Sequence, residues 1–244
     1  MNLDHPKRAQ VPQLRQLWKD VFGDTDAFLD NFYSKAFSPD RCLCATIGDE
    51  VVAMAYWFHC EEYAYIYAVA AAEAHRGQGI SHALLSRIHE ILTERGYDGC
   101  ILVPGEESLR KFYRGMGYEN CGGVEEFEAE AGTPLPLRKL EPAEYAALRK
   151  KYLPEGGVIQ EGASLDFLTC WAHFYEAPNA LAAAIWEDGK LLVLDLLGDA
   201  QEAPGIVAAL GEKTGWFRTP GEKPFAMHKP LNCNNPPKYF AFCF

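Results

Sequence analysis

Residues 63–95 read YAYIYAVAAAEAHRGQGISHALLSRIHEILTER, and this stretch decides the fold. Its first eight residues are aromatic, β-branched or small, a composition typical of a buried strand. The glycine-rich segment His75-Arg76-Gly77-Gln78-Gly79-Ile80-Ser81 follows, and apolar residues then recur every three or four positions to about Arg95, as in an amphipathic helix. Gly96 stands where a glycine commonly ends a helix. The stretch therefore predicts a strand, a glycine-rich loop and a helix.

This order of elements predicts an anion site. The first turn of a helix has unpaired N–H groups and a partial positive charge, and glycines let a phosphate approach the backbone closely. The candidate donors are the amides of residues 77–81, with the Arg76 side chain beside them. The Walker A pattern is absent, and the dinucleotide fingerprint lacks its third glycine because His82 occupies that position. A plain helix start with two turn glycines remains the structural alternative.

The segments on either side of this stretch have their own periodicity. Upstream, residues 11–22 and 26–37 show helical spacing, and two strand-like runs at 42–47 and 51–59 are joined by a Gly48-Asp49-Glu50 turn. Downstream, a short strand at 100–103 precedes a helix from about Glu107 to Arg114. We therefore expect two helices and three strands before the loop, and a strand and a helix after it.

The second half of the chain starts over after a glycine-rich boundary. Ala131-Gly132-Thr133-Pro134 separates two predicted domains, residues 1–131 and 132–244. The second contains a strand-like run at 137–140, helical runs at 142–152 and 165–175, and a hairpin of 180–186 with 191–197. This order echoes residues 11–59, which suggests a degenerate internal repeat.

Composition excludes several classes of function. The 244 residues carry 23 Lys and Arg against 34 Asp and Glu, a net charge of −11, which disfavours nucleic-acid binding. No apolar run is long enough to predict a membrane span or a signal peptide, so we expect a cytoplasmic protein without membrane association. We expect the eight cysteines to be free, mostly buried thiols, and their spacing does not predict a metal site. An acidic chain suits a substrate that is itself basic, such as an amine or a Lys-bearing peptide.

Residues 63–118 resemble the core of the GNAT (GCN5-related N-acetyltransferase) superfamily. That family's pattern is a strand, then Arg/Gln-x-x-Gly-x-Gly/Ala opening a helix, then a strand and a helix ending in Phe-Tyr-x-x-x-Gly-Phe/Tyr. This chain offers Arg76-Gly77-Gln78-Gly79-Ile80-Ser81 and Phe112-Tyr113-Arg114-Gly115-Met116-Gly117-Tyr118. The resemblance implies an α/β (α+β) GNAT fold with a mixed, mostly antiparallel sheet flanked by helices. A degenerate GNAT-like C-terminal domain without the phosphate loop would follow.

The resemblance also implies roles for matched residues and a co-substrate, acetyl-CoA. The backbone of Val69 and Ala71 would pair with pantetheine, and Tyr113 would protonate the departing thiolate. Phe112 would pack near the pantetheine arm or in the core. The residues implied for the pyrophosphate are Arg76, Gly77, Gln78, Gly79, Ile80 and Ser81. Ser81 replaces the usual Gly or Ala, and Glu106 stands where many members have a cofactor-contacting Asn.

Amine acylation also needs a base, because a protonated amine is not nucleophilic. Glu61 and Glu62 directly precede the predicted pantetheine strand, and we take Glu62 as the candidate base. His82 and His89 share a face of the predicted helix, which we expect to be solvated. The predicted function is direct transfer of an acetyl group to a primary amine of a small molecule or peptide. A transferase of longer acyl groups and a non-catalytic acyl-CoA-binding regulatory module remain the alternatives.

Overall fold

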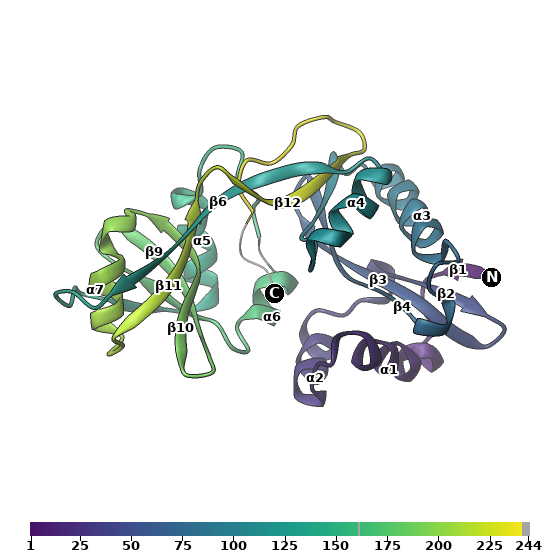
Figure 1. The fold of residues 1–244 in the computed structure, drawn as a ribbon, viewed down its shortest axis with the longest axis horizontal. Helices are drawn as coiled ribbons and strands as arrows, with labels where there is room; N and C mark the ends of the chain where they lie inside the picture. Colours follow the sequence, from purple (N-terminus) through teal and green to yellow (C-terminus); the bar gives the residue numbers. More distant parts are fainter. Residues whose placement is uncertain (161, 241–244) are drawn as a thin grey trace. The chain divides into compact units, whose positions relative to one another are not determined.

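The computed structural model describes residues 1–160 and 162–240. The chain divides into two compact units, which we describe separately. The first unit comprises Met1–Leu102, Lys111–Tyr118 and Lys229–Asn235, and the second comprises 103–110, 119–228 and the described residues from Pro236. Each unit contains a mixed sheet with helices on its two faces (Figure 1).

The first unit is built on the strand order β1-β2-β3-β4-β5. Successive neighbours are antiparallel except β4 and β5, which are parallel. The strands are β1 (Asn2–Asp4), β2 (Cys42–Ile47), β3 (Glu50–Cys60), β4 (Tyr63–Ala71) and β5 (Gly99–Leu102). The helices are α1 (Val11–Phe22), α2 (Asp26–Lys35), α3 (Ile80–Glu94) and, in its Lys111–Gly115 half, α4 (Glu107–Gly115).

Local signals in the sequence set the ends of α1 and α2. Gly23 ends α1 in the left-handed conformation with φ of +76°, and the Thr25 side chain accepts a hydrogen bond from the Phe28 amide (3.2 Å) to cap α2. The Trp18 ring of α1 packs against Phe32 of α2 and Tyr56 of β3, with ring centroids 4.7 and 5.3 Å away. These two helices cover one face of the sheet, and α3 covers the other (Figure 1).

The second unit repeats this order of elements. Its strands run β11-β10-β9-β8-β7 in the sheet, and β10 and β11 are parallel while the other three pairs are antiparallel. The repeated elements are β7 (Arg138–Leu140), α5 (Pro142–Tyr152), α6 (Ala163–Leu168), β8 (His173–Glu176), β9 (Ala180–Glu187), β10 (Lys190–Gly198), α7 (Ala203–Ala209) and β11 (Thr214–Pro220). Two further strands, β6 (Glu119–Glu130) and β12 (Lys223–Pro230), extend this sheet beyond β11.

Strand β9 shows why the second unit has a core on each face of its sheet. Leu181, Ala183 and Ile185 pack with α5 and α6, whereas the alternate residues pack with α7. Side chains of a strand alternate between faces with a period of two, so one apolar run serves both cores. The strand is therefore buried on both sides.

The structure confirms the predicted mixed, mostly antiparallel sheet flanked by helices, and it corrects one element. The helix predicted over 165–175 is confirmed only to Leu168, where α6 ends, and is wrong from His173, where β8 begins and pairs with β7 and β9. The predicted domain boundary at 131/132 falls just after β6 and stays a prediction. None of the helices in the described residues is long and apolar enough to cross a bilayer.

Candidate active site

The glycine-rich loop joins β4 to α3 as an exposed turn. Gly77 and Gly79 have φ values of +74° and +76°, a backbone region that residues with a Cβ rarely adopt. An added Cβ at either glycine would meet nothing within 4 Å, so the space in front of the loop is open. The glycines are needed for backbone conformation rather than to make room for neighbouring protein atoms.

The first turn of α3 leaves its amides available. Gly79 is the N-cap residue and has no side chain to accept from them, unlike Thr25 at the start of α2. The first intrahelical bond runs from the Ala83 amide to the Gly79 carbonyl (3.0 Å), and amides before it have no intrahelical partner. The backbone of Ile80 and Ser81 thus offers donors at the positive end of a fifteen-residue helix.

Two predicted loop side chains brace the loop. The Arg76 Nε donates to the Ala71 carbonyl (3.3 Å), and the Gln78 Nε2 donates to the Ala74 carbonyl (3.2 Å). Both side chains remain exposed. They hold the turn in shape, and the Arg76 guanidinium lies at the end of β4.

Strand β4 has a free edge where pantetheine is expected. It pairs with β5 at Tyr63, Ala64 and Tyr65, whereas its pairing with β3 continues to Ala71. A β-bulge interrupts the β3 side, because Ala68 and Val69 both lie opposite the single residue Ala55, and Ala68 has φ of +49°. The backbone from the bulge to Ala71 is therefore not engaged by β5 and leads directly to the loop.

Tyr113 lies in the last turn of α4 and is nearly buried, with 7% of its surface exposed. Burial raises the pKa of its hydroxyl to about 12, so it holds its proton at neutral pH. Its ring packs edge-on against Phe112 (5.2 Å between centroids) and Tyr118 (5.6 Å). Phe112 is 36% exposed, so it is not a core residue.

The structure does not bring Glu62 to the loop. Glu62 is exposed in the turn between β3 and β4, and its carbonyl accepts from the Asp98 amide (2.9 Å). Seven strand positions separate it from Val69, about 23 Å at the rise of a β-strand. The role of Glu62 as the base stays a prediction, and its position in the turn before β4, far from the loop, argues against that role.

Sequence reasoning missed a buried polar cluster behind the loop helix. The sequence predicts a solvated face for both His82 and His89. His82 is exposed, but His89 is buried. The Nε2 atom of His89 lies 2.8 Å from the Tyr118 hydroxyl. Cys100 lies 3.2 Å from the same hydroxyl. The tyrosine that ends the Phe-Tyr motif was the available signal, because a buried hydroxyl needs partners.

Among the described residues of the second unit, the segment between β10 and α7 is not a glycine-rich loop with free amides. Where α7 begins, Asp199 Oδ1 accepts from the Gln201 amide (2.9 Å), and the Glu202 carboxylate accepts from the backbone and side-chain amides of Asn179 (3.0 and 2.9 Å). Pro204 in the first turn of α7 has no N–H. Two carboxylates and a proline therefore stand where the first unit presents free amides.

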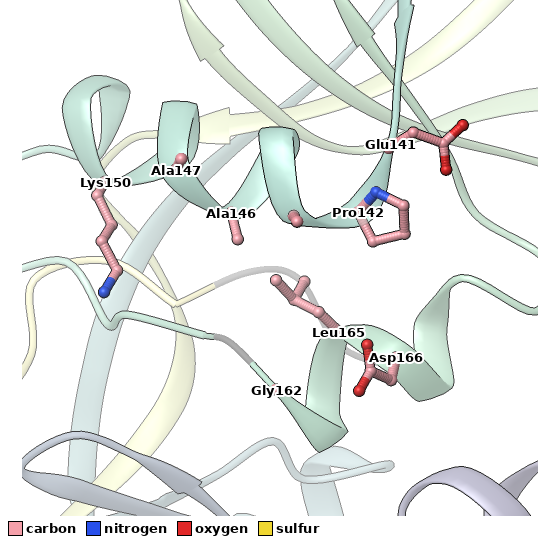
Figure 2. A pocket seen from close by; sticks show the side chains of 9 residues that line it. Glu141, Pro142, Ala146, Ala147, Lys150, Gly162, Leu165 and Asp166 are labelled. Carbon is pink, nitrogen blue, oxygen red and sulfur yellow. The ribbon is translucent and has the colours of Figure 1, made fainter.

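The second unit instead has a hollow of about 710 Å³ between α5 and α6. Figure 2 shows Leu165 pointing across it toward the alanines of α5, with Lys150 at one end and Asp166 toward the other. None of the predicted site residues lies in it. Among the residues that the structure describes, no three His, Cys, Asp or Glu side chains gather as a metal site requires.

Comparison with known proteins relates the sequence of the first half of the chain to a family. Residues 2–121 match the model of the acetyltransferase (GNAT) domain. Residues 2–121 therefore form a GNAT domain. The match covers β1 to the start of β6, and thus the loop, the free edge of β4 and Tyr113. No curated protein matches the sequence.

Solved GNAT structures resemble the whole chain and not only its first half. A GCN5-related N-acetyltransferase from Kribbella flavida has a TM-score of 0.74 at 19% identity, covering 95% of this chain and 71% of the other. One from Anabaena variabilis has a TM-score of 0.70 at 13% identity, covering 95% and 73%. One from Sphaerobacter thermophilus has a TM-score of 0.57 at 12% identity, covering 98% and 97%. At these identities the likeness shows a shared fold.

Proposed function

We propose that this GNAT protein transfers an acetyl group from acetyl-CoA to a primary amine of a small molecule or peptide. The observation that carries the proposal is the uncapped first turn of α3, entered through two left-handed glycines beside the free edge of β4. Open space in front of Gly77 and Gly79 fits a pyrophosphate, and the β4 edge after Ala68, which β5 does not pair, fits the amides of pantetheine. Bound acetyl-CoA would supply a thioester carbonyl open to attack.

In this proposal the residues of the chain divide the work. The amides of residues 77–81 and the Arg76 side chain hold the phosphates, and the backbone of Val69 and Ala71 orients the pantetheine arm. Phe112, partly exposed, packs beside that arm. The amine nitrogen forms a bond to the thioester carbon, the carbon–sulfur bond breaks, and the thiolate takes the Tyr113 hydroxyl proton. The amine gives up one proton to a base or to water.

Tyr113 is protonated near neutral pH, because burial raises its pKa to about 12. It keeps its proton until the pH rises toward that value, so loss of the acid does not limit the rate near neutrality. We also propose a cytoplasmic setting, which agrees with the seven described cysteines being free thiols.

Thermal unfolding with and without acetyl-CoA tests the proposal. A ligand that binds only the native state stabilises it, by about 2.7 kcal/mol at a hundredfold excess over the dissociation constant. We expect this stabilisation in the wild type and its loss in Gly79→Asp, because the added carboxylate repels the phosphates. Turnover with an amine panel then separates an acetyltransferase from a binding module, and longer acyl-CoAs test the chain length.

The chain offers a matched control for the backbone effect. Gly23 has φ and ψ of 76° and 9°, almost the same as the 76° and 8° of Gly79, and an added Cβ is equally unobstructed. Gly23→Asp therefore introduces the same strain and charge away from the loop, and it should keep the full response to acetyl-CoA. An unresponsive wild type, or equal responses in the two variants, would mean that the loop does not bind acetyl-CoA.

A further inference from the structure

The hydroxyl of Tyr118 is the meeting point of three elements of the candidate site. It lies 2.8 Å from His89 Nε2 on α3 and 3.2 Å from Cys100 Sγ on β5. Tyr118 itself lies three residues after the end of α4. All three side chains are buried, with 7% or less of their surface exposed. One hydroxyl thus joins the loop helix, the strand beside β4 and the end of the helix that carries Tyr113.

The backbone links Tyr118 to Tyr113 as well. The Tyr113 carbonyl accepts from the amides of Met116 (2.9 Å) and Tyr118 (3.1 Å), and Gly117 makes the turn with φ of +85°. Lys229 Nζ donates to the Met116 carbonyl (2.7 Å) and holds the same turn from the other side. The Tyr118 ring then meets the Tyr113 ring edge to face, at 65°.

Packing alone does not require a hydroxyl at this position. A phenylalanine would make the same ring contact with Tyr113, whereas a buried hydroxyl without partners is costly. The Tyr118 hydroxyl has two partners, His89 on α3 and Cys100 on β5. These two contacts fix one orientation of the Tyr118 ring among the orientations that packing would allow. A satisfied buried polar network specifies a unique packing in this way.

We propose that Tyr118 is a positioning residue for acyl transfer: held by His89 and Cys100, it fixes the Tyr113 ring and the end of α4 relative to the phosphate-loop helix. This inference rests on the proposed function of the same site. Tyr118 does not touch the reacting atoms in this scheme. Its effect on the rate passes through the orientation of Tyr113.

A double-mutant cycle tests the inference. Tyr118→Phe keeps the ring and removes the pinned hydroxyl, and we expect it to lower kcat about tenfold, less than the hundredfold that a 1 Å misplacement can cost. The KM for acetyl-CoA should change less than about twofold, because the loop amides are untouched. If Tyr118 acts through Tyr113, then Tyr113→Phe/Tyr118→Phe is no slower than Tyr113→Phe alone.

The control is a tyrosine–histidine pair elsewhere in the first unit. The Tyr97 hydroxyl lies 3.0 Å from His59 Nδ1, and Tyr97→Phe removes a bond of the same kind with no link to α4. This variant should keep the wild-type kcat. Amide hydrogen exchange gives a second readout that does not depend on turnover, since the Met116, Gly117 and Tyr118 amides should exchange faster in Tyr118→Phe but not in Tyr97→Phe.

The outcomes separate this inference from the proposed function. An unchanged kcat in Tyr118→Phe, or losses that add in the double variant, overturns the positioning role while acyl transfer stands. A Tyr113→Phe enzyme as fast as wild type also overturns it, because there is then no acid to position. A wild type that binds acetyl-CoA but acylates no amine overturns the proposed function, and the positioning role with it.

Discussion

At the scale of single residues, the second unit contains a buried charge pair whose loss has a predictable cost. Arg149 Nε donates to Asp195 Oδ2 (2.8 Å), and both side chains are 2% exposed or less. Tyr145 donates to the same oxygen (2.7 Å), and Tyr239 donates to Oδ1 (2.5 Å). Asp195 thus has a partner on each oxygen, as a buried carboxylate requires.

Asp195→Asn should destabilise the chain strongly. The change leaves the Arg149 guanidinium buried without its counter-charge, and breaking a buried pair from one side costs about 3–5 kcal/mol. Urea unfolding measures the loss. Arg138→Met is the control, because Arg138 pairs with Glu144 and Glu176 at the exposed surface and should shift the midpoint little. Equal effects of the two changes would contradict this view of the pair.

His89 should make stability depend on pH. Burial, with a smaller contribution from Lys229, lowers the pKa of His89 from 6.5 to about 3. Below pH 6.5 His89 is protonated in the unfolded chain but stays neutral in the folded chain. The contribution of neutral His89 to the unfolding free energy is therefore fully present above pH 6.5 and is lost as the pH falls toward 3. Between pH 7 and 5 the loss is about 2 kcal/mol.

His89→Gln should therefore flatten the fall in unfolding free energy between pH 7 and 5 by about that amount. Urea titrations at the two pH values check it. His82→Gln changes an exposed histidine seven residues earlier on the same helix, the smallest of the causes that lower the pKa of His89, and should change the slope only slightly. A wild-type slope in His89→Gln would show that His89 is not held neutral in the folded chain.

At the scale of elements, sequence predicted best where the signal is local. The helix from Ile80 depends on apolar spacing within fifteen residues and follows two glycines that have positive φ values in the structure. The segment 165–175 failed because its apolar residues fit helical spacing as well as strand alternation. Pairing of His173–Glu176 with β7 and β9 decided between the two, and such pairing cannot be read from a local window.

The parts of the site that escaped prediction depend on the geometry between elements. Glu62 is close to Val69 in sequence, but an extended strand carries it about 23 Å away. The bulge at Ala68 has no sequence signal that we recognise. Conversely, 29 positions separate His89 from Tyr118, and only the packing of α3 against the end of α4 brings them within hydrogen-bond distance.

At the scale of the whole molecule, the same topology occurs twice, but only the first unit leaves backbone groups open at the candidate site. The two units share the order strand, two helices, three strands, helix and strand. They differ in the segment that leads from the third of the three strands, β4 or β10, to the following helix, α3 or α7. In the first unit β4 leads from its bulge to free amides. In the second unit, Thr219 of β11 donates to the Leu196 carbonyl of β10 (2.8 Å), and Glu202 receives the Asn179 amides at the start of α7.

This difference predicts one acetyl-CoA per chain. Near the start of α7 the second unit pairs backbone hydrogen-bonding groups within the protein, whereas the corresponding amides at the start of α3 are open. In addition, carboxylates at a helix N-terminus repel phosphate. Isothermal titration calorimetry should therefore give a stoichiometry of one, and Gly79→Asp should abolish the heat of binding altogether. Gly23→Asp should keep the stoichiometry of one. Two sites in the wild type, or one site remaining in Gly79→Asp, would place a cofactor in the second unit. Binding there would require the hydrogen bonds between Glu202 and Asn179 to break.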